Sequence, residues 1–274
     1  MLMSHRRTDP VDMAMMDSLE QKVALITGAS RGIGSATARA LAAEGVDVVL
    51  LARSEDRLRE LADALETEQG VDTHVAATDI TDADAVNRAV QAAVTSLGRL
   101  DIVVNNAAAG TVEYDDRFEE SSVAECGRII ETNLTGAINV THATLSHVRE
   151  RQGNVIFVGS SAAMRPRPGS MIYSASKWGL RGFALSLEAH VGQDGIAVTS
   201  IHTSLVRTER WADVPPGAGA EPEEIARAVV YAATQPAHST ISELTVHRRD
   251  ILGKFVPDGV DIDLAFELPE QDSS

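Results

Sequence analysis

Cysteine is nearly absent from this chain, because Cys126 is the only one among 274 residues. One thiol forms neither an internal disulfide nor a metal site built from several cysteines, and the histidines lack metal-ligand spacing. Long apolar runs are missing too: no stretch approaches the roughly 20 residues of a membrane span, and the first 21 residues lack the apolar core of a signal peptide. These absences predict a cytoplasmic protein that uses no metal and no membrane.

Lysine is scarce as well. Only Lys22, Lys177 and Lys254 contribute to the 24 basic residues, which stand against 40 acidic residues and leave a net charge of −16. This charge disfavours nucleic acid and anionic membranes as partners. Such usage is typical of a GC-rich genome or of a salt-filled cytoplasm, and of these two origins we favour a halophilic host.

A regular alternation of short apolar runs with helical patterns is present. The apolar runs predict strands at 23–26, 46–51, 75–77, 100–104, 155–158, 196–201 and 242–246. The longest helical patterns between them lie at 123–151, 173–190 and 221–234. Alternation of this kind implies βαβ units, and hence one doubly wound α/β domain with a parallel sheet of about seven strands and helices on both faces. We place this domain at residues 22–250, with an N-terminal extension at 1–21 and an acidic C-terminal tail at 251–274.

Two residues beyond the middle of the chain have a spacing suited to proton transfer. Tyr173 and Lys177 are four residues apart, so on a helix their side chains lie on one face, one turn apart. At about 4 Å and an effective dielectric near ~20, an ammonium stabilises a phenolate by roughly 4 kcal/mol. This makes Tyr173 a usable acid. Ser160 follows the apolar run 155–158, and its hydroxyl can donate a hydrogen bond to a substrate oxygen.

A glycine-rich turn follows the first predicted strand. It reads Thr-Gly-Ala-Ser-Arg-Gly-Ile-Gly over residues 27–34 and leads into a helix. Glycines there let the backbone approach a diphosphate, whose charge lies at the N-terminus of the helix. The spacing Gly-x-x-x-Gly-x-Gly, together with Tyr-x-x-x-Lys at 173–177, resembles the short-chain dehydrogenase/reductase family, a family with a Rossmann domain, over about residues 20–250.

This resemblance implies a function and a set of site residues. The chain is expected to be an oxidoreductase that transfers a hydride between nicotinamide and a carbonyl or secondary alcohol. The family's catalytic set is matched by Asn133, Ser160, Tyr173 and Lys177, with Ser161 as the alternative to Ser160. The residues expected to hold the cofactor are Gly28, Ser30, Arg31, Gly32, Ile33, Gly34, Arg53, Asp79, Ile80, Asn105, Tyr173, Lys177, Val206 and Thr208.

The end of the second predicted strand bears on the choice of cofactor. It reads Leu-Ala-Arg at 51–53, where an NAD-preferring enzyme usually carries an acidic residue. Arg53 and Arg31 suit a 2′-phosphate instead, because a guanidinium presents a planar fork to it. We therefore favour NADP(H) over NAD(H). The alternative is that Arg53 is solvated and that Arg31 stacks on the adenine of either cofactor.

Two positions depart from the family pattern. Ala108 stands where the family usually has glycine, and Thr203-Ser204 stands where it usually has Pro-Gly, which leaves the backbone path there open. The segment 210–222 lies where the family keeps its substrate lid, and Arg165 and Arg167 flank the expected pocket.

The resemblance leaves the substrate open between two classes. We expect a small or medium carbonyl compound, and the alternative is a 3-oxoacyl thioester on acyl-carrier protein or coenzyme A, although the Asp-Gly-Gly ending frequent in such reductases is missing. A non-catalytic dinucleotide-binding regulatory protein is the hypothesis from another class. The family assembles through the faces formed by helices such as 123–151 and the Tyr173 helix, so a homodimer or homotetramer is expected.

Overall fold

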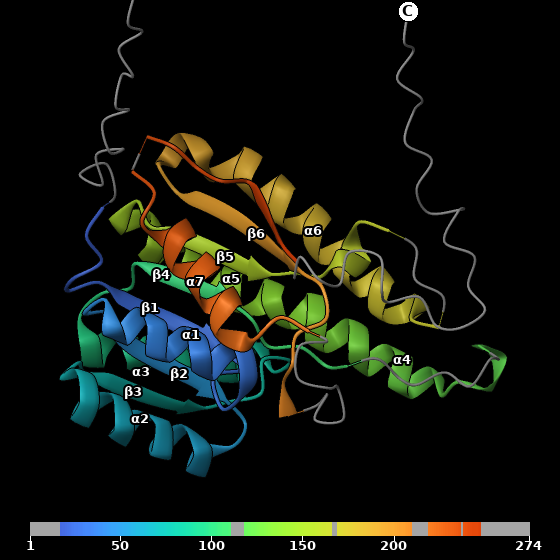
Figure 1. Ribbon diagram of the computed structural model, residues 1–274, viewed down its shortest axis with the longest axis horizontal. Coiled ribbons are helices and arrows are strands. Elements are labelled where there is room, and N and C mark those ends of the chain that lie inside the picture. Colours follow the sequence, from blue (N-terminus) through green and yellow to red (C-terminus); the bar gives the residue numbers. More distant parts are fainter. Residues whose placement is uncertain (1–16, 111–117, 166–168, 210–218, 237, 248–274) are drawn as a thin grey trace, which may run out of the picture.

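The computed structural model describes residues 17–110, 118–165, 169–209, 219–236 and 238–247. Within these residues, seven strands form one parallel sheet in the order β3-β2-β1-β4-β5-β6-β7 (Figure 1). The strands are β1 (Val23–Thr27), β2 (Asp47–Ala52), β3 (Thr73–Ala77), β4 (Ile102–Asn105), β5 (Asn154–Val158), β6 (Ala197–Thr203) and β7 (Glu243–Val246). Each predicted strand is present, and the predicted doubly wound α/β fold is confirmed.

Helices cover both faces of the sheet (Figure 1). One face is covered by α1 (Gly32–Ala43), α2 (Glu55–Gln69) and α7 (Pro222–Ala233). The other face is covered by α3 (Ala83–Leu97), α5 (Gly136–Arg151) and α6 (Met171–Val191), and α4 (Val123–Ile130) precedes α5. None of the helices in the described part of the chain is long and apolar enough to cross a membrane.

The central strands β1, β2, β4 and β5 are mostly apolar because both of their faces are buried, whereas β3, β6 and β7 also carry polar residues. In β1, Ala24 and Ile26 belong to the core beneath α1, α2 and α7, whereas Val23 and Leu25 belong to the core beneath α3, α5 and α6. Leu19 packs in the first of these two cores and is 3% exposed. The core beneath α1, α2 and α7 therefore includes a residue of the stretch 1–21, which the sequence pattern predicts to be an N-terminal extension.

The helical region predicted over 123–151 is interrupted. It consists of α4, a π-helical turn η3 (Glu131–Thr135) and α5. Such turns are rare and occur frequently at functional sites. Here the turn carries Asn133, whose side chain is buried. Helical periodicity does not reveal the turn, because the residues on either side of it keep helical backbone angles.

Candidate active site

A cleft of ≈ 1150 Å³ opens at the carboxyl ends of the strands. β1 lies between β2 and β4, so the strand order reverses there, and ligands of open α/β sheets bind at such a switch point. Gly34, Asn105 and Asn133 lie outside the lining of this cleft. The other predicted site residues line it: Gly28, Ser30, Arg31, Gly32, Ile33, Arg53, Asp79, Ile80, Ser160, Tyr173, Lys177, Val206 and Thr208.

The turn between β1 and α1 depends on two glycines. Gly28 has a φ of +66°, and a Cβ there would lie 2.9 Å from the Cα of Ala107. At Gly34, a Cβ would lie 2.2 Å from the carbonyl oxygen of Gly28. A side chain at either position would collide with backbone, so only glycine fits. The first turn of α1 therefore packs directly on the loop, and its unpaired N–H groups lie at the cleft.

Thr27 and Asn106 join the ends of β1 and β4. The Thr27 hydroxyl accepts hydrogen bonds from the backbone N–H groups of Asn106 and Ala107, at 2.9 and 3.0 Å. The Asn106 amide donates to the Thr27 carbonyl at 2.9 Å. The predicted residue Asn105 is buried instead, and its amide donates to the Thr141 hydroxyl. Of the two adjacent asparagines, Asn106 therefore lines the cleft, which the sequence motif alone does not decide.

The loop after β3 forms one wall of the cleft. Thr81 donates hydrogen bonds from its backbone N–H and its hydroxyl to the Asp79 carboxylate, at 3.0 and 2.9 Å. The bond from the Thr81 backbone is the main cause that lowers the pKa of Asp79, and the charge of Arg53 contributes less. Asp79 is therefore an ionised acceptor at neutral pH. Ile80 is 6% exposed and packs against Gly136, where a Cβ would lie 2.6 Å from the Ile80 side chain.

Three arginines line the same end of the cleft. Arg53 follows β2, and its guanidinium lies 3.8 Å from the Asp79 carboxylate. Arg31 precedes α1, and Arg57 lies in the first turn of α2; both contact one oxygen of Glu209, at 3.8 and 3.0 Å. Sequence motifs indicate neither Arg57 nor Glu209, because these residues meet only through the fold.

Tyr173 and Lys177 lie in the first two turns of α6, and both line the cleft. The Lys177 Nζ lies 5.8 Å from the centre of the Tyr173 ring and donates to the carbonyl oxygen of Val158 at 3.1 Å. Lys177 is only 3% exposed, so little solvent screens its charge. The ammonium and the positive end of the α6 dipole therefore both place positive charge near the Tyr173 side chain.

Asn133 connects the loop after β4 with α6. Its side-chain oxygen accepts a hydrogen bond from the N–H of Ala109 at 2.7 Å, and its amide donates to the Ser176 hydroxyl at 3.0 Å. Ser176 donates in turn to the carbonyl oxygen of Tyr173 at 2.7 Å. The π-helical turn therefore ties one wall of the cleft to the first turn of α6.

Ser160 follows β5 and caps the short helix η4 (Ser161–Ala163). Its hydroxyl accepts a hydrogen bond from the N–H of Ala162 at 3.2 Å, which leaves the hydroxyl proton available for donation. Ser160 lines the cleft and is 5% exposed, whereas Ser161 lies outside the lining. Of the two adjacent serines, Ser160 therefore lines the same cleft as Tyr173.

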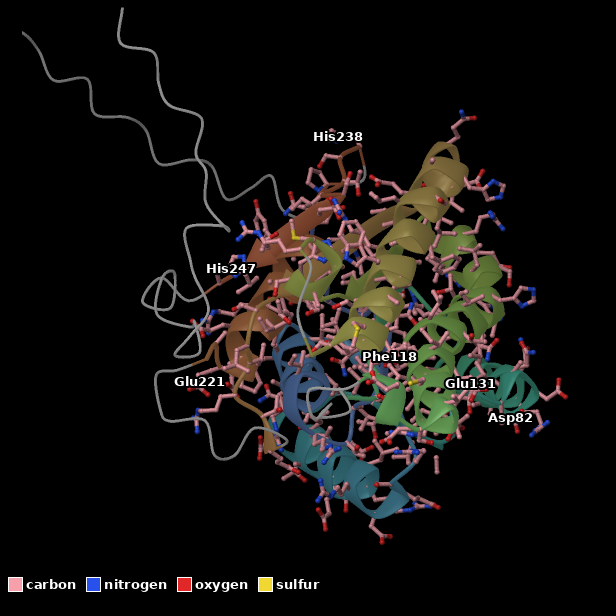
Figure 2. All side chains as sticks on the ribbon, turned by 90° about the vertical axis from the view of Figure 1, so that its right-hand side faces the viewer. Asp82, Phe118, Glu131, Glu221, His238 and His247 are labelled. Atoms are coloured by element: carbon pink, nitrogen blue, oxygen red, sulfur yellow. The ribbon has the colours of Figure 1, made fainter. Side chains whose placement is uncertain are left out.

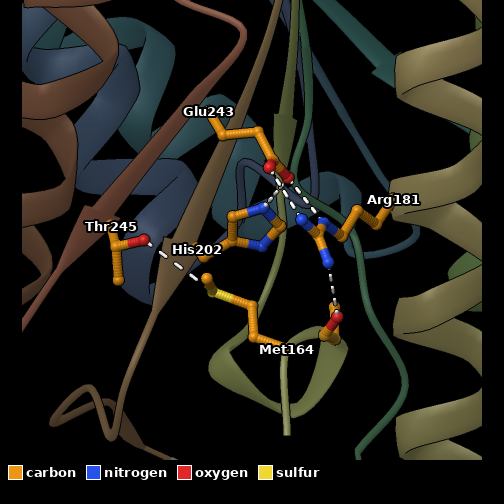
Figure 3. A network of polar contacts seen from close by, with 6 residues as sticks. Met164, Arg181, His202, Glu243 and Thr245 are labelled. Carbon is orange, nitrogen blue, oxygen red and sulfur yellow. Dashed lines mark hydrogen bonds and ion pairs between the residues drawn. The ribbon is translucent and has the colours of Figure 1, made fainter. Parts of the chain in front are cut away.

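A polar network behind η4 joins α6, β6 and β7 (Figure 3). Arg181 donates two hydrogen bonds to the Glu243 carboxylate, at 2.6 and 2.8 Å, and His202 contacts the same carboxylate at 2.8 Å. These contacts, chiefly those of Arg181, lower the pKa of Glu243 to about 2. Arg181 also donates a hydrogen bond to the Ala163 carbonyl oxygen at 3.5 Å. The His202 ring packs against Gly159, where an added Cβ would lie 2.7 Å from the His202 Nδ1. The network thus packs against the turn that leads from β5 into η4.

The segment after β6 continues along β7 and then crosses to the glycine turn. The Ser204 N–H donates to the Val246 carbonyl at 3.3 Å, which extends the pairing of β6 with β7. Val206 forms an isolated β-bridge and is 6% exposed. Thr208 then lies against the first residue of α1, since a Cβ added to Gly32 would be 3.1 Å from the Thr208 methyl group. The departure from Pro-Gly before this segment still leaves Val206 and Thr208 on the cleft.

Several expectations fall outside the described residues. These are Arg167, most of the segment 210–222 and the terminal stretches 1–16 and 248–274. Arg165 is described and exposed, and it lies outside the lining of the cleft. In the described ranges, no group of three or more His, Cys, Asp or Glu side chains is arranged to hold a metal ion.

A doubly wound parallel sheet with a glycine turn at its switch point defines a dinucleotide-binding protein. The sequence profile of short chain dehydrogenases matches residues 22–218. An oxidoreductase of Staphylococcus epidermidis is 32% identical over 234 residues, which cover 84% of this chain and 99% of the relative. The chain therefore belongs to the short-chain dehydrogenase family and is an oxidoreductase of that family.

Solved structures of two enzymes share the fold over nearly their whole length. L-sorbose reductase from Gluconobacter frateurii, complexed with NADPH and L-sorbose, has a TM-score of 0.77 at 29% identity and covers 84% of this chain and 97% of its own. The 3-ketoacyl-(acyl-carrier-protein) reductase from Brucella melitensis, complexed with NADH, has a TM-score of 0.76 at 28% identity and covers 85% of this chain and 100% of its own. Related structures thus contain nicotinamide dinucleotides with and without the 2′-phosphate.

Proposed function

We propose that this chain is an NADP(H)-dependent reductase that acts on a carbonyl group, with the secondary alcohol as the product of reduction. The observation that carries the proposal is that the Tyr173–Lys177 pair, Ser160 and the glycine turn line one cleft. The nicotinamide supplies or accepts the hydride when it is bound. The side chains of the protein bind and orient the reactants and move the proton.

Tyr173 transfers the proton. Its phenol donates to the substrate oxygen during reduction and takes the proton back during oxidation. Lys177, which donates a hydrogen bond to the Val158 carbonyl, stabilises the phenolate that is left behind and would bind the ribose hydroxyls of the bound cofactor. The Ser160 hydroxyl donates to the substrate oxygen as negative charge gathers there. Asn133 acts through the loop and helix that it connects.

The residues of the cleft also fit the dinucleotide. Gly28 and Gly34 let the turn and the first turn of α1 pack closely, so that the backbone N–H groups at the N-terminus of α1 can receive the diphosphate. When the dinucleotide is bound, Asp79 would accept a hydrogen bond from the adenine amine, and Thr208 would bind the carboxamide or a phosphate of the cofactor. The preference for NADP(H) over NAD(H) rests on Arg31 and Arg53, whose guanidiniums suit a 2′-phosphate.

The proposal also covers the substrate class, the cellular location and the oligomeric state. A small or medium carbonyl compound is the first candidate, and a 3-oxoacyl thioester is the second, which the likeness to the Brucella enzyme favours. We further propose a cytoplasmic homodimer or homotetramer, with the catalytic domain ending near residue 250 and an acidic tail following it.

Steady-state oxidation of NADPH and of NADH against ketones, aldehydes and 3-oxoacyl thioesters, in high and low salt, tests this proposal. We expect turnover with NADPH, and we expect Tyr173→Phe to lower kcat at least about 100-fold while the Kd for NADPH stays within about twofold. Tyr231→Phe is the matched control, because Tyr231 lies exposed on α7 and away from the cleft. Full activity in Tyr173→Phe would refute the mechanism. Cofactor binding without turnover on the whole panel would favour the regulatory protein.

A further inference from the structure

One oxygen of the Glu209 carboxylate contacts arginines from two different elements. Arg57 of α2 lies 3.0 Å from it, and Arg31, before α1, lies 3.8 Å from it. The three side chains are between 51% and 58% exposed. Ion pairs this exposed are weak, because water screens them and competes for the same groups. A stronger anion that enters the cleft can therefore displace the carboxylate.

We propose that Arg57 determines cofactor specificity by binding the 2′-phosphate of NADP(H), and that Glu209 competes with this phosphate for Arg31 and Arg57. The inference rests on the proposed preference for NADP(H). It adds a third cation, Arg57, to the predicted pair of Arg31 and Arg53. It also assigns to the acidic residue Glu209 the opposite effect on the affinity for NADP(H).

The charges at this end of the cleft favour a dianion. Arg31, Arg53 and Arg57 carry three positive charges, against two negative charges on Asp79 and Glu209. Arg53 is 80% exposed, and its contact with Asp79 is long, at 3.8 Å. A guanidinium has five N–H donors, and a phosphate accepts from such forks in pairs of parallel hydrogen bonds. A 2′-phosphate therefore offers these arginines more acceptors and more charge than the single Glu209 oxygen does.

Arg57 and the other arginine of α2, Arg59, have different surroundings. Arg57 lines the cleft and donates a hydrogen bond to Glu209, which also lines it and lies 152 positions further along the chain. Arg59 lies outside the lining and pairs with Glu55 within the helix, at i and i+4. Arg59 is thus a matched control: it has the same side chain on the same helix, and its partner lies within that helix.

Calorimetric titration of the full chain with 2′,5′-ADP and with 5′-AMP tests the role of Arg57 without turnover. The two probes differ only in the 2′-phosphate. We expect Arg57→Gln to weaken 2′,5′-ADP binding about 10- to 100-fold and to leave 5′-AMP binding within about twofold. Arg59→Gln is expected to leave both affinities unchanged. An Arg57→Gln protein that binds both probes like the wild type would overturn the assignment.

The same titration of Glu209→Gln tests the competition. Loss of the carboxylate charge is expected to tighten 2′,5′-ADP binding about 3- to 10-fold, with little effect on 5′-AMP. Weaker binding of 2′,5′-ADP would show that Glu209 holds the arginines in place and would overturn the competing role. If the wild type binds 2′,5′-ADP no better than 5′-AMP, the NADP(H) preference itself fails. Tight wild-type binding that Arg57→Gln does not alter refutes the role of Arg57 alone.

Discussion

Gly34 determines how closely helix α1 packs against the turn that precedes it. A Cβ there would lie 2.2 Å from the Gly28 carbonyl oxygen and 2.7 Å from the Asn106 amide nitrogen. The closer of these atoms belongs to backbone, which cannot move aside like the end of a flexible side chain. The absence of a side chain at this position therefore lets α1 begin directly against the turn.

We predict that Gly34→Ala opens this turn. The overpacking is expected to lower the free energy of unfolding by roughly 1–3 kcal/mol, measured by denaturant titration, and to weaken the affinity for the dinucleotide at least about tenfold. Gly127→Ala is the control, because Gly127 lies in α4 and a Cβ there meets nothing within 4 Å. That variant is expected to gain up to about 1 kcal/mol from helix propensity. Unchanged dinucleotide affinity in Gly34→Ala would contradict the steric argument.

Among the elements, α6 connects the catalytic residues to the sheet. Its first turns carry Tyr173 and Lys177, and the next turn carries Arg181. Arg181 binds Glu243 of β7 through two hydrogen bonds, so the helix is held at the edge of the sheet as well as by its buried face. The network in Figure 3 is therefore expected to contribute to the stability of the fold.

The pKa of Glu243 gives this contribution a pH dependence. Its pKa is about 2 in the folded protein, below the ordinary value of 4.5. The folded state thus binds this proton less tightly than the unfolded state, so the stabilisation is present above pH 4.5 and is lost as the pH falls towards 2. We predict that the difference in unfolding free energy between the wild type and Glu243→Gln, from urea titrations, shrinks between about pH 6 and about pH 3. A difference that stays constant over this range would contradict the assignment.

At the scale of the whole molecule, the outer face of α6 is unusually apolar for a protein with a net charge of −16. Met171, Trp178 and Leu185 recur at every seventh position and are 44%, 45% and 39% exposed. The single acidic residue of the helix is Glu188, which is half-buried and accepts a hydrogen bond from Ser242. Figure 2 shows α6 beside α5 on the side that faces the viewer. An apolar face of this kind suits contact with a second copy of the chain.

We predict that Trp178→Glu shifts the protein from a dimer or tetramer towards the monomer. A carboxylate at the centre of an apolar interface loses its hydration without gaining a partner. Light scattering after size exclusion, at several protein concentrations, measures the mass. Ala92→Glu places the same charge on the exposed side of α3 and is expected to leave the mass unchanged. Equal masses for the wild type and Trp178→Glu would rule out this face as the interface.

The sequence by itself determined the fold class and the positions of the strands. Central strands that are buried on both faces are mostly apolar, and the helices between strands return the chain to the same edge, so local patterns carry this information. The Tyr173–Lys177 pair and the glycine turn can be predicted from the sequence for the same reason. Each motif depends on the spacing of residues within one short segment of the chain. The halophilic host suggested by the composition stays a prediction.

Only the tertiary structure decided which neighbours these residues have. It placed Asn106 on the cleft in place of Asn105, and it inserted a π-helical turn at Asn133 that helical periodicity does not show. It also brought Arg57 to Glu209 across 152 positions of sequence. Contacts of this kind depend on how distant segments pack, because no local rule of spacing or propensity relates residues on separate elements.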